Sequence, residues 1–142
     1  MSYEHLYNFR NGTIIMAFKI DHALATYYSD CLWTIESNDY AKLDWDASNS
    51  KPKPTLEDLQ SKVAALNAAE PMKRLRCERD RLLAESDWVV TKAAETGVAE
   101  TDAWKTYRQE LRDLPSTQTP EMEEEPTTQL GIKNVTWPTK PS

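Results

Sequence analysis

Glycine, cysteine and histidine are scarce in this sequence, and each scarcity excludes a kind of chemistry. The 142 residues include three glycines, too few for a glycine-rich loop that wraps a phosphate. Cys31 and Cys77 are isolated and have no CxxC spacing, so we expect two free thiols rather than a disulfide framework or a zinc site. His5 and His22 lie far apart in the sequence. The sequence therefore predicts no metal, no cofactor and no histidine-based catalytic triad.

Long hydrophobic runs and an excess of positive charge are also missing. No segment approaches the roughly 20 apolar residues that cross a bilayer, and the first residues lack the basic-then-apolar order of a signal peptide. The formal net charge of -6 opposes an overall attraction to nucleic acid or to anionic lipid. With 39% hydrophobic and 28% charged residues, the composition predicts modest cores, no membrane contact and a cytosolic location.

Residues 1–50 carry the signals of a small module with both helix and strands. Asn11-Gly12 is a two-residue turn signal between short apolar runs, which predicts a hairpin near the N-terminus. Apolar residues at helical spacing predict a helix over 20–29. The sequence from Met16 onward has the pattern of an independent opening, so Met16 is either an internal residue or a second start.

A second hairpin is expected within the same module. Runs at 32–35 and 40–45 have the composition of β-strands and flank a polar turn at 36–39. Because a lone hairpin is marginal in water, its apolar side chains should cover another element. We expect four of them to pack on the 20–29 helix or on another chain: Trp33, Tyr40, Leu43 and Trp45.

A connecting helix is predicted within residues 51–70. Thr55 is a good N-cap, and acidic residues follow it in the first turn. Apolar residues then recur at spacings of three and four, as in paired helices: Leu56, Leu59, Val63 and Leu66. This short seam is compatible with packing inside the chain and with a homo-oligomer, trimers included. Pro71 is expected to interrupt or kink the helix.

Residues 71–114 show the pattern of two amphipathic helices. Gly97 is a candidate C-cap after the first, and Thr101 is a candidate N-cap for the second. The apolar stripe of the second helix consists of Trp104, Tyr107, Leu111 and Leu114. A short connection between such helices predicts an antiparallel hairpin, which we expect to stop at Pro115.

The composition changes after this hairpin. Residues 115–131 are acidic, rich in proline and threonine, and without apolar periodicity, which predicts an extended or flexible linker. Residues 132–142 place Trp137 among prolines, which indicates an extended strap that docks on another surface. The predicted fold class is α+β: a small N-terminal β-hairpin and helix module, a long kinked helix, an antiparallel two-helix hairpin and an extended C-terminal strap.

Charged residues leave two functional readings open. Basic residues gather at 73–81 and recur at Lys105, Arg108 and Arg112, but acidic residues are interleaved with them and dilute a field directed at phosphate. A nucleic-acid-associated regulatory module that uses the 73–81 helix is therefore the alternative function, and salt-dependent binding would be its mark. The acidic residues lie in ordinary charged helix surface, so no catalytic residue is predicted.

Three motifs follow one another over residues 71–142. They are RCERDRLLAESDW at 76–88, WKTYRQELRD at 104–113 and WP at 137–138. In this order and spacing they resemble the phage tail assembly chaperone-like domain of small tail-associated bacteriophage proteins, including those of cyanobacterial phages. Residues 71–114 would form the helical hairpin of that domain.

The resemblance implies a non-enzymatic protein that binds phage tail or tail-fibre polypeptides. It would act in the host cytoplasm as a transient assembly chaperone, or remain in the virion tail as a fibre-associated component. We expect Asp87 and Asp113 to form structural ion pairs, Asp87 with Arg108 or Arg112, while Trp88 packs against Trp104. The expected partner-binding residues are Arg76, Arg79, Trp88, Trp104, Tyr107, Arg108, Arg112 and Trp137.

Overall fold

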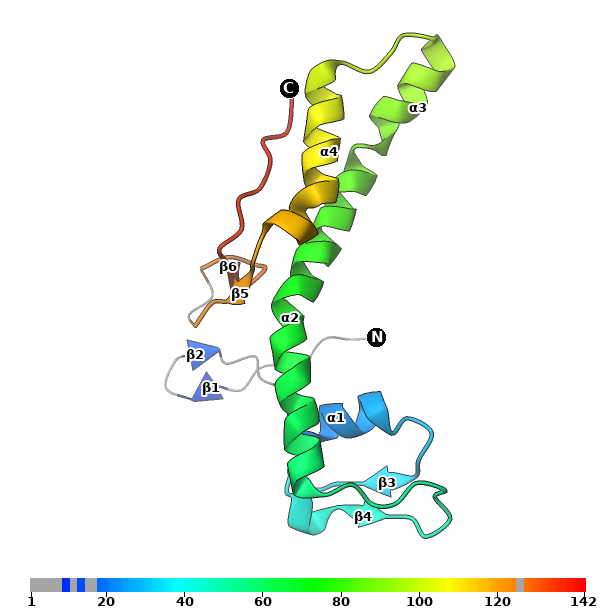
Figure 1. Ribbon diagram of the computed structural model, residues 1–142, viewed down its shortest axis with the longest axis vertical. Coiled ribbons are helices and arrows are strands. Elements are labelled where there is room, and N and C mark those ends of the chain that lie inside the picture. Colours follow the sequence, from blue (N-terminus) through cyan, green and yellow to red (C-terminus); the bar gives the residue numbers. More distant parts are fainter. Residues whose placement is uncertain (1–8, 11–12, 15–17, 125–126) are drawn as a thin grey trace. The chain divides into compact units, whose positions relative to one another are not determined.

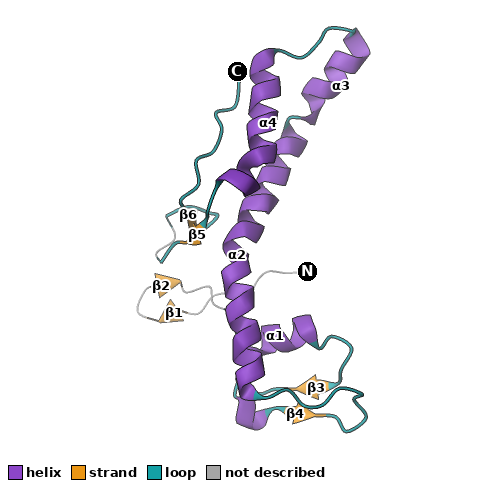
Figure 2. Cartoon of the chain, in the orientation of Figure 1, coloured by secondary structure: helices purple, strands orange, loops and turns teal. Residues whose placement is uncertain are grey.

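The computed structural model describes residues 9–10, 13–14, 18–124 and 127–142 (Figure 1). The chain divides into two compact units, Met1–Ala69 and Glu70–Ser142. Helix α2, Leu56–Glu85, contributes its first part to one unit and its second part to the other. The described residues combine helices with short two-stranded sheets (Figure 2), so the predicted α+β class is confirmed.

Two short strands precede the first helix. Strand β1, Phe9–Arg10, pairs antiparallel with β2, Thr13–Ile14, so the strands flank the predicted turn. The turn residues Asn11-Gly12 lie outside the described residues, as does Met16.

A second hairpin packs beside α1, Ile20–Tyr27. Strand β3, Trp33–Thr34, pairs antiparallel with β4, Asp44–Trp45, and places the two tryptophans opposite each other. A 3-10 turn, Tyr40–Lys42, occupies the start of the expected second strand, because the Asp39 side chain accepts a hydrogen bond from the Ala41 amide at 3.0 Å.

The core of the first unit is apolar. Its buried members are Ala23, Leu24, Leu43 and Leu59, and the hairpin aromatics surround them. Val63 and Leu66 also pack against this core, so most of the predicted helix seam is covered inside the chain. Leu56 is the seam residue that stays exposed, at 39%.

Helix α2 begins where the sequence predicts. The Thr55 hydroxyl oxygen accepts from the Asp58 amide at 3.1 Å, and an Asp58 carboxylate oxygen accepts from the Thr55 amide at 3.3 Å. This reciprocal capping satisfies amides that the first helical turn leaves unpaired.

The prediction that Pro71 interrupts the helix is wrong. Helix α2 continues through Pro71 to Glu85, and the bend lies at Ser86 instead. Proline removes the one hydrogen bond that its own N–H would make. Pro71 is buried, and Leu75 packs in the core of the second unit one turn later.

In the second unit, the end of α2 and helix α4, Asp102–Thr117, run side by side in opposite directions (Figure 1). Helix α3, Asp87–Thr96, lies between them in the chain. Gly97 ends α3 with a left-handed φ of 69°, as predicted. Thr101 occupies the predicted N-cap position of α4 with extended backbone, but its side chain makes no capping hydrogen bond. The buried core consists of Leu75, Val89, Trp104, Tyr107, Leu111, Leu114 and Ile132.

Helix α4 does not stop at Pro115, where the sequence analysis expected its end. It continues to Thr117, and the carbonyl groups of its last turn are hydrogen-bonded. The Ser116 hydroxyl donates to the Asp113 carbonyl at 2.8 Å, and the Gln118 amide donates to the Leu114 carbonyl at 3.0 Å. Proline is therefore tolerated in this final turn.

The segment expected as a linker, 115–131, contains ordered structure. Strand β5, Glu121–Met122, pairs antiparallel with β6, Ile132–Lys133, and puts Met122 opposite the buried Ile132. The Arg74 side chain donates to the Leu130 carbonyl at 2.8 Å and ties this hairpin to α2. None of the described helices is long and apolar enough to span a membrane.

Candidate functional site

The bend between α2 and α3 is centred on Ser86. Its backbone has φ -100° and ψ 0°, and its amide donates to the Leu83 carbonyl at 3.0 Å, three residues earlier. The Ser86 hydroxyl donates to the same carbonyl at 2.8 Å, and the side chain is fully buried. The Leu83 carbonyl therefore accepts two hydrogen bonds from Ser86, three residues later, instead of only the regular α-helical bond.

Arg108 of α4 reaches into this bend. It is 8% exposed, and its Nη1 donates to the Leu83 carbonyl at 3.0 Å and to the Ser86 hydroxyl at 2.5 Å. Its Nη2 donates to Asp87 Oδ1 at 2.8 Å. We call Leu83, Ser86, Asp87 and Arg108 the bend clamp. A cation at the C-terminal end of α2 and a carboxylate in the first turn of α3 both match the helix dipoles.

Three aromatic rings lead from the core of the second unit to its surface. Trp104 contacts Tyr107 edge-on at 5.8 Å between ring centroids, and Trp88 contacts Trp104 in the same way at 5.7 Å. The exposed fraction rises from 3% for Tyr107 and 9% for Trp104 to 52% for Trp88. Burial, with a further contribution from Glu85, raises the pKa of Tyr107 above its usual value.

The structure distributes the expected partner-binding residues over different environments. Arg76, Trp88 and Arg112 are exposed, whereas Arg79 and Trp137 are partly buried. The other three belong to the interior of the second unit: Trp104, Tyr107 and Arg108.

The two aspartates expected in ion pairs differ. The structure brings Asp87 to Arg108 and leaves Arg112 bonded to Gln109 at 3.3 Å. The Asp113 carboxylate accepts from the side-chain amide of Gln109 at 3.0 Å and forms no ion pair within the described part of the chain. Asp87 is therefore part of the bend clamp, whereas Asp113 is a surface residue of α4.

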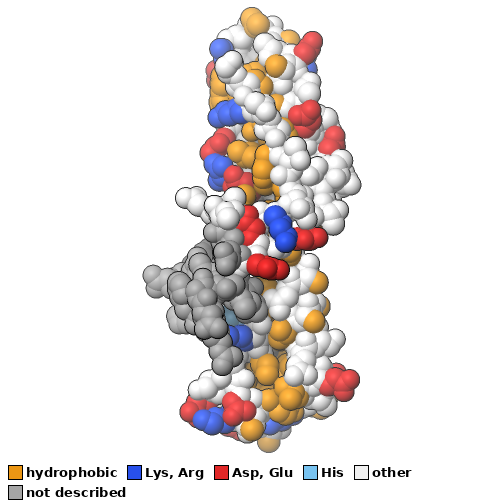
Figure 3. Space-filling view, turned by 90° about the vertical axis from the view of Figure 1, so that its left-hand side faces the viewer, with side chains coloured by type: hydrophobic (Ala, Val, Ile, Leu, Met, Phe, Trp, Pro, Cys, Tyr) orange, Lys and Arg blue, Asp and Glu red, His pale blue; other side chains and the backbone are white. Residues whose placement is uncertain are grey.

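The basic stretch 73–81 is largely paired with local carboxylates. Arg74 lies 2.8 Å from Glu70, and Arg79 lies 2.6 Å from Asp80. Arg81 contacts Glu78 and Glu85, and its hydrogen bond lowers the pKa of Glu78. Basic and acidic side chains also alternate over the face drawn in Figure 3. Such pairing reduces the field that this helix would present to phosphates.

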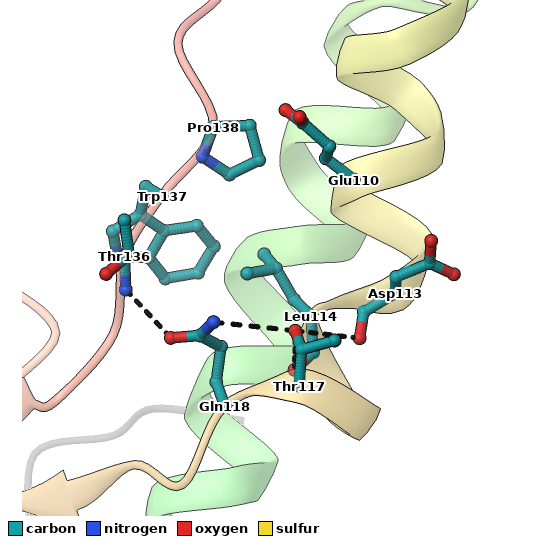
Figure 4. A pocket seen from close by; sticks show the side chains of 8 residues that line it. All are labelled: Glu110, Asp113, Leu114, Thr117, Gln118, Thr136, Trp137 and Pro138. Carbon is teal, nitrogen blue, oxygen red and sulfur yellow. Dashed lines mark hydrogen bonds between the residues drawn. The ribbon is translucent and has the colours of Figure 1, made fainter.

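A groove that the sequence analysis did not predict lies between α4 and the C-terminal strap, residues 134–142. Its volume is about 350 Å³, and Figure 4 shows the side chains that line it. Gln118 joins its two sides, because its side-chain oxygen accepts from the Thr136 amide at 3.0 Å. The lining residues are Glu110, Asp113, Leu114, Thr117, Gln118, Thr136, Trp137 and Pro138. Trp137 was the sequence signal for a docked strap, but nothing in the pattern indicated the surface on which it docks.

Comparison with family models matches residues 72–142 to the phage tail assembly chaperone protein family. The chain belongs to this family. The match begins close to the start of the second unit and confirms the resemblance drawn from the three motifs. Searches of curated proteins and of solved structures returned no match.

Membership of the phage tail assembly chaperone family gives the chain a role in bacteriophage tail assembly. The bend clamp, the three aromatic rings of Trp88, Trp104 and Tyr107, and the groove all lie within the matched residues. The described part of this tail assembly chaperone contains no cluster of three or more side chains suited to hold a metal ion.

Proposed function

We propose that this phage tail assembly chaperone works without catalysis, by holding a tail or tail-fibre polypeptide on the exposed surface of its second unit. The exposure of Trp88 carries the proposal. Trp88 keeps 52% of its surface in solvent while Trp104 fixes one side of the ring. An indole in this position offers a large apolar area at a low entropic cost, and tryptophan is enriched among the residues that dominate interface energies.

The buried members of the expected set would support this surface rather than form it. Trp104 packs against Trp88, and Tyr107 packs against Trp104. Arg108 holds the bend from which α3 and Trp88 start. The exposed Arg76 and Arg112 would then supply the polar margin, because arginine is also frequent in interfaces.

A pull-down tests the proposed surface. The tagged full-length chain would be expressed during infection, and the captured tail and tail-fibre proteins would be quantified by mass spectrometry. We expect Trp88→Ala to reduce capture at least about tenfold, the effect of a hot-spot residue. Leu32→Ala is the matched control, since Leu32 is another exposed apolar residue, at 63%, in the first unit. Equal capture by wild type and Trp88→Ala would refute the proposed surface.

The same proposal covers two modes of action, in the host cytoplasm during assembly or in the finished tail. Quantitative proteomics on purified virions and on the infected-cell lysate separates them, using peptides from residues 55–113. A fixed copy number per particle would make the protein a tail component. Peptides confined to the lysate would make it a transient chaperone.

A further inference from the structure

We propose that the groove between α4 and the C-terminal strap binds a basic side chain, preferably arginine, of the partner polypeptide. The inference rests on the proposed function in assuming a polypeptide partner. It concerns a different place, because Trp88 does not line the groove.

Part of the groove lining is aromatic and apolar. Trp137 and Pro138 come from the strap, and Leu114 lies opposite on α4 (Figure 4). Leu114 is 3% exposed, so its side chain is part of the fixed core. Trp137 is partly buried and keeps a surface toward the groove. An indole face attracts a guanidinium or an ammonium group through its quadrupole, and the flat guanidinium can also stack on it.

The charged residues that line the groove are acidic, Glu110 and Asp113. The Glu110 side chain extends from α4 toward the strap (Figure 4). Within the described ranges, the Glu110 carboxylate forms no hydrogen bond and no ion pair with another residue. The lining residues include no lysine and no arginine. A basic side chain would pair with this carboxylate while it stacks on Trp137, whereas a neutral side chain would make the stacking contact alone.

Hydrogen bonds within the chain join the two sides of the groove. Gln118 accepts from the Thr136 amide at 3.0 Å and donates to the Thr117 hydroxyl at 3.4 Å, so the end of α4 holds the strap. Preorganisation of this kind lowers the ordering cost of binding. A volume of about 350 Å³ is at the small end of ligand sites and suits one long side chain rather than a folded domain.

Nuclear magnetic resonance of the full-length, nitrogen-15-labelled chain tests the inference. The probe is the peptide acetyl-Gly-Arg-Gly-amide, and Trp137→Phe assigns the Trp137 indole signal. We expect saturating shifts of that signal and of α4 amides around Glu110. A peptide with citrulline in place of arginine keeps the shape and lacks the charge, so it should bind at least about fivefold more weakly.

Variants separate the groove from general charge effects. Glu110→Gln should weaken arginine-peptide binding by about fivefold, the scale of one partly exposed ion pair. Glu95→Gln is the matched control, because Glu95 is an exposed acid on α3 outside the groove, and it should leave binding unchanged. Absence of saturating shifts, equal binding of the citrulline peptide, or unchanged binding by Glu110→Gln would each overturn the inference.

The test also separates this inference from the proposed function. Trp88→Ala should leave the peptide titration unchanged. If the arginine peptide does not bind while capture of tail proteins still depends on Trp88, only the inference about the groove is refuted. If the arginine peptide binds as expected while capture of tail proteins does not depend on Trp88, the inference about the groove is supported and the proposed Trp88 surface is refuted.

Discussion

The two units of this protein are stabilised in different ways. The buried side chains of the first unit are apolar, and Leu24 and Leu59 are among its fully buried residues. The second unit also buries Ser86 and Arg108, and Arg108 donates a hydrogen bond to the Ser86 hydroxyl at the bend. Apolar packing depends mainly on volume, whereas a hydrogen-bonded cation fixes an angle between elements. The second unit thus specifies the direction of a helix in a way that the first does not.

The two units also use tryptophan differently. In the first unit, the Trp33 indole donates to the Tyr28 carbonyl at 3.3 Å, and the Trp45 indole donates to the Lys51 carbonyl at 3.1 Å. These bonds tie both rings to backbone segments of the first unit that flank the hairpin. In the second unit, Trp88 contacts the Trp104 ring, has Lys92 Nζ 5.9 Å from its ring centre, and keeps 52% of its surface exposed. The comparison separates tryptophans that build the fold from one that is available to a partner.

The largest expected effect is that of Leu24→Ala in the first unit. Leu24 is fully buried, so the substitution removes apolar contacts and leaves a cavity, at a cost of about 3 kcal/mol. Urea unfolding would measure the loss, and hydrogen exchange would locate it within residues 20–66. The surface variant Leu32→Ala should stay within about 0.5 kcal/mol of wild type. Equal loss of protection in residues 75–114 would remove the distinction between the units.

Arg108→Met should have the next largest effect, about 2 kcal/mol, and it should be confined to the second unit. Methionine fills much of the same space but donates no hydrogen bond to Leu83, Ser86 or Asp87. Hydrogen exchange should increase most around residues 83–89. Arg112→Met is the control, since Arg112 is exposed on the same helix. If both variants were equally stable, the bend would not depend on the clamp.

Asp87→Ala should cost less than about 1 kcal/mol. A buried ion pair that loses one partner would cost several kcal/mol, and Asp87 would be such a partner if its pair with Arg108 were enclosed. Its side chain is 65% exposed, however, and Arg108 retains its bonds to the Leu83 carbonyl and to Ser86. Thermal unfolding of the variant beside Arg108→Met checks the difference. A loss as large as that of Arg108→Met would show that the carboxylate is the essential partner.

Tyr107→Phe should have the smallest effect and a characteristic pH dependence. Burial raises the pKa of the Tyr107 hydroxyl in the folded state. The unfolded chain ionises near pH ~10, so the stability linked to this group is present below that pH and is lost as pH rises toward the folded pKa. Phenylalanine has no such loss. Urea unfolding should therefore show wild type losing stability relative to the variant between about pH 9 and 11, with a constant difference below that range.

Local rules in the sequence predicted the ends of several helices. Thr55 with Asp58 forms a reciprocal cap, and Gly97 adopts the left-handed backbone that a glycine C-cap favours. The apolar stripe of α4 became core because its spacing keeps Trp104, Leu111 and Leu114 on one side. In each case the decisive residues are close together in the chain.

Features that depend on distant residues could not be predicted in this way. The bend at Ser86 needs Arg108 from another helix, and Pro71, the stronger local signal, lies in an unbroken helix. The paired strands β5 and β6 contain few apolar residues, Met122 and Ile132 among them. The sequence therefore has no apolar periodicity that would predict their pairing. Arg108 itself was identified as a site residue, but its burial depends on acceptors that the fold brings together.

The bend clamp also has a consequence for the order of events during synthesis. The residues of α2 and the start of α3 are synthesised before Arg108 is added to the chain. A nascent chain that ends before Arg108 therefore has Leu83, Ser86 and Asp87 without the guanidinium that joins them. The direction of α3, and with it the outward position of Trp88, is fixed late, once α4 has been made and has docked.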